Sequence, residues 1–323
     1  MLDLGSGGGK ICYIASQIVG PSGRVIGVDF NPAMLKLARK HQKTVAKRIG
    51  WNNVEFRRGR IQDLRTDLEA FERRLAKYPI ATLEDFDAAE EARVAASLKA
   101  PLIADGSVDI VISNCVLNLV PAAEKPRLFR EMHRVLKHGG RVAISDIVSD
   151  EEVPEHLRGD PKLWSGCISG AYQEREFLRA FEDAGFYGIA IDKRDADPWQ
   201  TVEGIEFRSV TVTAFKGKEG PCIERNQAVI YKGPWSAVHD DYGHVLERGV
   251  PTAVCDKSFK IYTGAPYAGD IIPVPPRVEV PLSEADSYDC SRDRLRSPRE
   301  TKGLEYRATT EPAGECCSET DCC

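Results

Sequence analysis

Short runs of apolar residues alternate along the chain with longer segments in which apolar residues recur at helical spacing. Continuous apolar runs predict strands at residues 2–4, 24–30, 54–56, 108–114 and 141–146. Apolar residues spaced three and four apart predict helices after residue 9 and at 32–48, 122–136 and 177–184. A closing pair of strands is expected near 188–192 and 207–216. This alternation predicts a doubly wound, Rossmann-like α/β sheet.

Two regions depart from this pattern. Residues 64–104 are charged and Ala-rich with helical spacing, and we interpret them as a solvated helical insertion rather than a partner-binding element. We expect a main domain over residues 1–216 and a smaller C-terminal α+β region over 217–284, which includes a strand at 227–232. Residues 285–323 are polar and poor in apolar side chains, which predicts a disordered, Cys-rich tail.

Composition is typical of a soluble globular protein. Of 323 residues, 42% are hydrophobic and 29% are charged, and the net charge of −5 provides no broad basic surface for nucleic acid. No apolar run approaches the roughly 18 residues that cross a bilayer, and no charged-then-apolar signal pattern is found. We therefore expect a cytoplasmic monomer without nucleic-acid or membrane partners. Because Met1 falls inside the first strand, we also expect that an N-terminal segment is missing.

A glycine-rich loop follows the first strand, and an acid, Asp29, ends the second strand. Glycine lets backbone approach a ligand closely, and an acid at this place suits a ribose diol. The Gly-x-Gly-x-Gly spacing is tighter than that of nicotinamide enzymes and resembles the first motif of S-adenosylmethionine-dependent methyltransferases; the alternative is a purely structural turn. On the methyltransferase hypothesis, the expected cofactor-binding residues are Asp3, Gly5, Ser6, Gly7, Gly9, Asp29, Ile61, Gln62 and Asn114.

The cysteines are the candidate chemistry on the acceptor side. The chain has 10 cysteines, and in a cytosolic protein they are more often thiols or metal ligands than a disulfide framework. Cys12 lies in the first turn of the helix after the glycine loop, where the helix dipole favours a thiolate. Cys167 follows the fifth strand. The Asn/Asp-Pro-Pro-Tyr/Phe signature of nitrogen methylation is absent after the fourth strand, where the chain reads Ser113-Asn114-Cys115-Val116-Leu117-Asn118-Leu119.

Several such segments resemble the arsenite S-adenosylmethionine methyltransferase family. They are residues 113–119, 131–137, 145–146, 166–171 and 228–233, and the resemblance covers roughly residues 1–240. It implies a Rossmann-type fold with a C-terminal substrate domain, and trivalent arsenic held by cysteine thiolates.

Carried over by position, the resemblance implies that Cys12 and Cys167 are catalytic and hold arsenic. The family's next arsenic-binding cysteine falls on Ile205, and a further N-terminal cysteine would precede Met1. Either an external thiol such as glutathione completes the ligand set, or the tail pairs do so. The tail pairs are Cys316, Cys317, Cys322 and Cys323. We interpret the remaining cysteines as structural: Cys115, Cys222, Cys255 and Cys290.

Arsenic chemistry is compatible with such a site. Trivalent arsenic is soft and favours thiolates, and its lone pair can attack the sulfonium methyl group directly, without a general base. Because methyl transfer oxidises arsenic, a thiol reductant (glutathione or thioredoxin) is expected. Two alternatives stay open: a methyltransferase with an oxygen, nitrogen or carbon acceptor and structural cysteines, and an arsenic-binding protein with an incomplete catalytic core.

Overall fold

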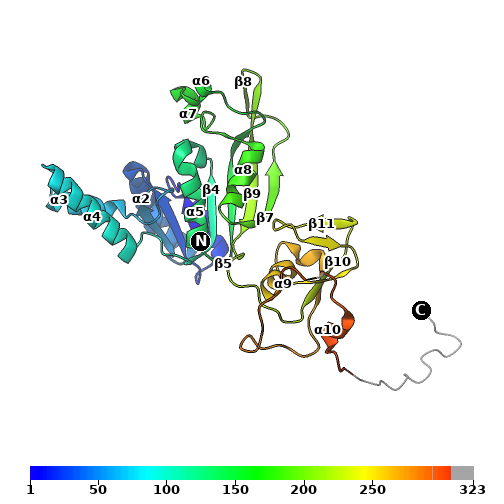
Figure 1. Ribbon diagram of the computed structural model, residues 1–323. Helices are drawn as coiled ribbons and strands as arrows, with labels where there is room; N and C mark the ends of the chain where they lie inside the picture. The colour runs from blue at the N-terminus through cyan, green and yellow to red at the C-terminus, as the bar shows by residue number, and fades with distance from the viewer. Residues whose placement is uncertain (293, 307–323) are drawn as a thin grey trace. The chain divides into compact units, whose positions relative to one another are not determined.

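The computed structural model describes residues 1–292 and 294–306. The chain divides into two compact units, Met1–Lys218 and Glu219–Cys323 (Figure 1). Among the described residues, no helix combines the length and apolar character needed to cross a bilayer.

The first unit is built on one mixed sheet in the order β3-β2-β1-β4-β5-β9-β7. Its strands are β1 (Leu2–Leu4), β2 (Val25–Asp29), β3 (Val54–Arg58), β4 (Val108–Asn114), β5 (Leu136–Ser149), β7 (Tyr187–Arg194) and β9 (Ile205–Phe215). β1 to β5 pair in parallel, and β9 is antiparallel to both β5 and β7. This arrangement confirms the predicted doubly wound α/β sheet. The strand order reverses between β1 and β4, which is the place where such sheets bind ligands.

Helices cover the sheet because each has an apolar face. They are α1 (Lys10–Val19), α2 (Pro32–Ile49), α5 (Lys125–Val135) and α8 (Glu174–Asp183). Phe129 of α5 packs edge-on against Phe177 and Phe181 of α8. Burying each such ring contributes about 1.5–3 kcal/mol. The Asn31 side chain caps α2 by accepting hydrogen bonds from the next two free amides, as its position before Pro32 predicts.

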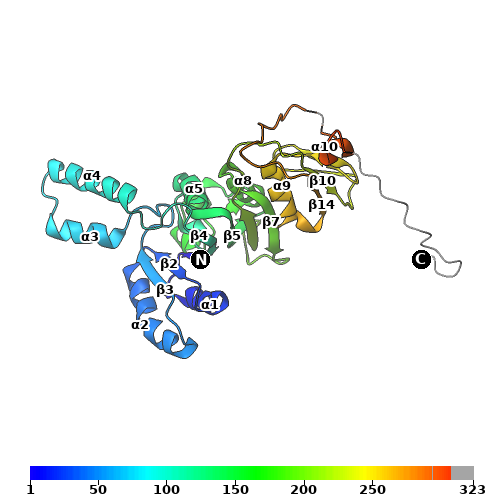
Figure 2. The same ribbon diagram turned by 90° about the horizontal axis from the view of Figure 1, so that it is seen from below.

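The helical insertion is a pair of helices, α3 (Leu68–Lys77) and α4 (Leu83–Lys99). Figure 2 shows them lying side by side and extending away from the sheet of the first unit. Thr82 and Asp85 form the capping box that begins α4. α3 has no buried residue, and Ala89 is the one buried residue of α4.

Shorter elements follow the main strands. They are η1 (Leu117–Leu119), η2 (Ala122–Glu124), α6 (Glu155–Arg158), α7 (Pro161–Ser165), β6 (Tyr172–Gln173) and β8 (Gln200–Val202). β6 pairs in parallel with the end of β5, and β8 is antiparallel to β9. The helix expected at 122–136 therefore begins as a 3-10 turn, and its last residue already belongs to β5.

The second unit carries a three-stranded antiparallel sheet in the order β13-β10-β14. Its strands are β10 (Ala228–Tyr231), β13 (Pro251–Ala253) and β14 (Ile271–Val274), and β11 (Ala237–His239) pairs with β12 (Val245–Glu247). Its helices are α9 (Asp256–Thr263), η3 (Tyr267–Gly269) and α10 (Pro298–Lys302).

The expectation of disorder from residue 285 is wrong for the described part of that segment. The Arg296 side chain is 1% exposed and pairs with Glu224 at 2.8 Å and Glu300 at 3.0 Å. Tyr288 donates a hydrogen bond to the carbonyl of Ala253 at 2.9 Å. Composition missed this order because charge pairs, rather than apolar burial, hold the segment. The predicted tail thiols Cys316, Cys317, Cys322 and Cys323 lie outside the described residues.

Candidate functional site

The loop between β1 and α1 uses its glycines in different ways. Gly5, Gly7 and Gly9 have φ angles of 73°, 50° and 82°, in the left-handed region that disfavours other residues. A Cβ at Gly5 would lie 2.5 Å from the Val116 side chain, and a Cβ at Gly9 would lie 2.6 Å from the Phe56 ring. A Cβ at Gly7 would meet no described atom within 4 Å. The loop therefore packs closely at Gly5 and Gly9 and is open at Gly7.

A cavity of about 590 Å³ lies at the carboxyl ends of β1, β2 and β3. This volume is in the usual range of small-molecule sites. Four predicted cofactor residues line it: Gly5, Asp29, Ile61 and Gln62. The other five are not part of its lining: Asp3, Ser6, Gly7, Gly9 and Asn114.

Asp29, the last residue of β2, is a polar residue in the lining of this cavity. One carboxylate oxygen accepts a hydrogen bond from the amide of Gly7 at 2.8 Å, and the other accepts from the amide of Asn31 at 2.8 Å. Asp29 therefore fixes the glycine loop against the start of α2. Each oxygen retains a lone pair, so the carboxylate can also accept hydrogen bonds from a ribose diol.

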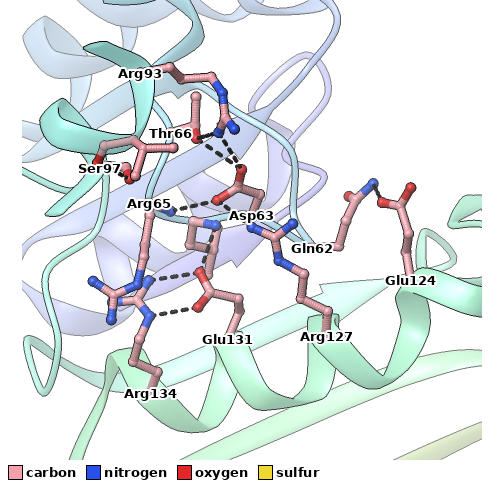
Figure 3. A network of polar contacts seen from close by, with 12 residues as sticks. Gln62, Asp63, Arg65, Thr66, Arg93, Ser97, Glu124, Arg127, Glu131 and Arg134 are labelled. Carbon is pink, nitrogen blue, oxygen red and sulfur yellow. Dashed lines mark hydrogen bonds and ion pairs between the residues drawn. The ribbon is translucent and has the colours of Figure 1, made fainter. Parts of the chain in front are cut away.

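The apolar part of the cavity lining comes from residues that the sequence did not single out as cofactor contacts. Apolar side chains from two segments far apart in the sequence line it: Phe30, Met34, Val116, Leu119, Val120 and Pro121. Gln62 donates a hydrogen bond to Glu124 at 2.7 Å, which joins the loop after β3 to η2 (Figure 3). A nucleoside needs an apolar slot, a diol acceptor and close backbone. The described cavity offers all three, so its residues fit S-adenosylmethionine.

The loop after β3 is held by a second set of polar contacts (Figure 3). Asp63 pairs with Arg127 at 3.0 Å and accepts a hydrogen bond from the Thr66 hydroxyl at 2.9 Å. Glu131 accepts from the amide of Leu64 at 2.8 Å and pairs with Arg134 at 2.7 Å. These contacts tie the loop to α5. They thereby position Ile61 and Gln62, which line the cofactor cavity.

Cys12 is not where a thiolate ligand was expected. It is fully buried, and its thiol donates a hydrogen bond to the Asp3 carboxylate at 3.1 Å. Burial and the neighbouring Asp3 charge raise the pKa of the Cys12 thiol. The helix-dipole prediction fails because this turn of α1 faces the sheet, where a Cβ at Gly27 would touch the sulfur at 2.7 Å. Burial also raises the pKa of Asp3 to about 6.

Ser6 and Asn114 complete the predicted cofactor set. Ser6 packs against Gly27 beneath the loop, and its buried hydroxyl has no hydrogen-bond partner among the described residues. Asn114 is exposed at the end of β4 and is absent from the cavity lining. Neither side chain lines the cavity in this structure.

The structure brings Cys167 together with Cys115 rather than with Cys12. The Cys167 thiol lies 3.6 Å from the carbonyl oxygen of Cys115. Burial, followed by the charge of Asp146, raises the pKa of Cys167 to about 11, and the Lys125 ammonium partly opposes this shift. Both cysteines have left-handed backbone, with φ of 54° at Cys115 and 61° at Cys167. For a non-glycine residue that conformation costs roughly 1–2 kcal/mol.

Ile205 lies in the same region of the fold. It belongs to a buried apolar cluster at the start of β9, and Cys167 packs against this cluster. Among the described residues, no group of three or more His, Cys, Asp or Glu side chains is arranged to hold a metal ion. The described part of the site therefore brings two cysteine-bearing loops together.

Comparisons with known proteins agree with this geometry. Residues 1–96 and 86–185 match a family described as a methyltransferase domain, and residues 218–306 match a domain of unknown function, DUF8838. The chain is 33% identical over 280 residues to the arsenite methyltransferase of Aquipseudomonas alcaligenes, covering 83% of this chain and 70% of the relative. It is 29% identical over 343 residues to the arsenite methyltransferase of Homo sapiens, covering 100% of this chain and 80% of the relative.

A solved structure shows the same similarity in three dimensions. The crystal structure of an arsenic (III) S-adenosylmethionine methyltransferase from Chlamydomonas reinhardtii superposes with a TM-score of 0.55 at 26% identity. The match covers 89% of this chain and 88% of that chain. The predicted family is thereby confirmed, and this chain belongs to the arsenite methyltransferase family of S-adenosylmethionine-dependent methyltransferases.

Proposed function

We propose that this protein transfers the methyl group of S-adenosylmethionine to trivalent arsenic presented as a thiolate complex. The observation that supports this most is that the Cys167 thiol lies on a loop packed against the segment 115–121, part of which lines the cofactor cavity. The family assignment identifies the donor, and the soft thiol at this edge suits arsenic.

Each part of the site has a defined task in this reaction. When bound, S-adenosylmethionine supplies an electrophilic methyl group on its sulfonium. Asp29 accepts hydrogen bonds from the ribose, and the apolar wall excludes water from the cofactor. Cys167 holds arsenic so that its lone pair faces the methyl group. No general base is needed because that lone pair attacks directly, and the protein contributes orientation. Cys12, buried against Asp3, serves the packing under the glycine loop in this proposal.

Three further features belong to the same proposal. Arsenic becomes pentavalent as the new As–C bond forms, so an external thiol, glutathione or thioredoxin, returns it to the trivalent state. The tail pairs Cys316, Cys317, Cys322 and Cys323 are candidates to deliver arsenic. The protein acts as a cytoplasmic monomer on a small-molecule substrate, without nucleic-acid or membrane partners.

The proposal is tested by incubating the full chain with arsenite, S-adenosylmethionine and glutathione, and separating the arsenic species formed. We expect methylated arsenic together with S-adenosylhomocysteine, both lost in Cys167→Ser and retained in Cys290→Ser. S-adenosylhomocysteine that forms independently of arsenite would support the small-molecule alternative instead. Arsenic binding without any methylated product would support the binding-protein alternative.

A further inference from the structure

We propose that Cys115 is the second protein thiol of the arsenic site, so that Cys115 and Cys167 hold one trivalent arsenic between them. This inference rests on the proposed function, because it takes arsenic to be the substrate. Cys115 follows β4 and Cys167 follows α7, 52 residues apart in the sequence. Only the fold brings the two residues together.

Hydrogen bonds hold the two cysteine-bearing loops against each other. The Asn118 side-chain amide donates to the carbonyl of Cys167 at 3.0 Å and to the carbonyl of Ile147 at 2.6 Å. The Lys125 ammonium donates to the carbonyl of Gly170. A Cβ at Gly170 would lie 2.0 Å from the Asn118 carbonyl oxygen, so the loops are in direct backbone contact. The approach of Cys115 and Cys167 is therefore built into both loops.

Both cysteines are also placed where a ligand can reach them. Cys115 is exposed and Cys167 is half-buried, whereas Cys12 is fully buried in the core of the same unit. Both occupy left-handed backbone, which is uncommon outside glycine and frequent at functional sites. Asp146 stabilises the turn after Cys115, because its carboxylate accepts hydrogen bonds from the amides of Val116 and Leu117 at 3.0 and 2.8 Å.

The pair adjoins the cofactor cavity through the residue next to Cys115. Val116 lines that cavity, and its side chain packs against Gly5 of the glycine loop. Because Val116 directly follows Cys115 in the chain, arsenic bound at Cys115 would lie beside the cavity wall that contacts the donor. Cys115 also supplies a thiol that the start of β9 lacks, since Ile205 occupies the place where the family resemblance expects a cysteine.

The binding step balances without any oxidant. Arsenite reacts with the thiols of Cys115, Cys167 and one external thiol, forms three As–S bonds and releases three waters, and arsenic stays trivalent throughout. Each thiol proton leaves with an arsenite hydroxyl as water. Three-coordinate arsenic is thereby completed with two protein sulfurs, and its lone pair remains free for methyl transfer.

A cross-linking experiment tests the pair directly. Phenylarsine oxide bridges two neighbouring thiols with release of one water, so it reports which cysteines lie close enough to share an arsenic. The full chain is treated with one equivalent, digested without reductant and mapped by mass spectrometry. We expect a bridge between the peptides that contain Cys115 and Cys167. Bridges that join Cys167 to a different cysteine, or that lie only in the tail, would overturn the inference.

Turnover provides the second readout, with a matched control and a rescue. Cys115→Ser should raise the KM for arsenite about tenfold or more, because a two-point attachment becomes a single one, while S-adenosylmethionine affinity stays unchanged. Cys290→Ser, an exposed thiol in the other unit, should behave like the unmodified chain. Adding Ile205→Cys to Cys115→Ser should restore the KM, because the new thiol lies in the cluster against which Cys167 packs.

The outcomes separate this inference from the proposed function. Wild-type arsenite turnover in Cys115→Ser would reject Cys115 as a ligand and leave the methyltransferase function standing. A Cys115–Cys167 bridge in a chain that forms no methylated arsenic would reject the function and support the paired site.

Discussion

At the scale of single residues, the glycine loop shows how backbone conformation and close packing act separately. Gly9 and Gly50 both have left-handed backbone, with φ of 82° and 91°, but of the two only Gly9 has a neighbour in the way of a side chain. The two positions therefore form a matched pair. An alanine at either position would have the same strained left-handed backbone, but only the alanine at Gly9 would also collide with the Phe56 ring.

We expect Gly9→Ala to lower the free energy of unfolding by about 2–4 kcal/mol, because the added methyl collides with Phe56 as well as straining the backbone. Gly50→Ala should cost about 1 kcal/mol from backbone strain alone. Urea denaturation of both variants measures the difference. Equal losses would show that the Phe56 contact relaxes freely.

Asp3 predicts a pH dependence of stability. Its pKa is raised to about 6 by burial, so the folded chain holds this proton more tightly than the unfolded chain does. Its contribution to stability is present below pH ~4 and is lost as the pH rises through about 6. The free energy of unfolding of Asp3→Asn, relative to that of the unmodified chain, should therefore increase by about 1–3 kcal/mol between pH 4 and pH 7. Denaturation of both proteins from pH 4 to 7 tests the sign. A constant difference across that range would contradict it.

At the scale of elements, the important contacts join segments that the sequence separates widely. The loop after β4 meets the loop after α7 through Asn118, and the loop after β3 meets α5 through Asp63 and Glu131. Strand and helix positions followed from apolar spacing because those patterns are local. The loop pairings did not, because nothing near Asn118 in the sequence indicates that its amide will reach the carbonyl of Cys167.

Asn118→Ala should remove the side-chain donor to the carbonyl oxygens of Ile147 and Cys167, and the loss of these two hydrogen bonds costs about 1–3 kcal/mol of stability. We also expect the KM for arsenite to rise while the KM for S-adenosylmethionine stays the same, because Asn118 positions Cys167 and does not line the cofactor cavity. Thr82→Ala, which removes the cap of α4, is the control and should change neither KM. A parallel rise in both KM values would indicate general loosening of the fold instead.

At the scale of the whole molecule, the chain forms two units that are stabilised differently. The first unit has aromatic and aliphatic clusters on both faces of its sheet. The second depends visibly on ion pairs, with Arg296 between Glu224 and Glu300. Polar composition predicted disorder from residue 285 because composition counts apolar side chains and is blind to such pairing.

We expect Arg296→Ala to destabilise the second unit by about 2–3 kcal/mol, less than for a fully buried pair because Glu224 and Glu300 are 20% and 32% exposed. Arg299→Ala, which replaces an exposed arginine of the adjacent helix α10, should have little effect. Hydrogen exchange read separately in residues 1–218 and 219–306 measures this. Equal loss of protection in both ranges would show that the units unfold together.

Within residues 1–216, the sequence by itself determined the order of the main strands and helices, the glycine loop and the acid that ends the second strand, because each depends on residues close together in the chain. It also placed Asp29, Ile61 and Gln62 at the cavity, since parallel strands end at one edge. Only the tertiary structure decided which thiols meet. Cys12 is turned into the core by the face of α1 that packs on the sheet, while Cys115 and Cys167 are brought together by loops that touch only after the sheet has formed.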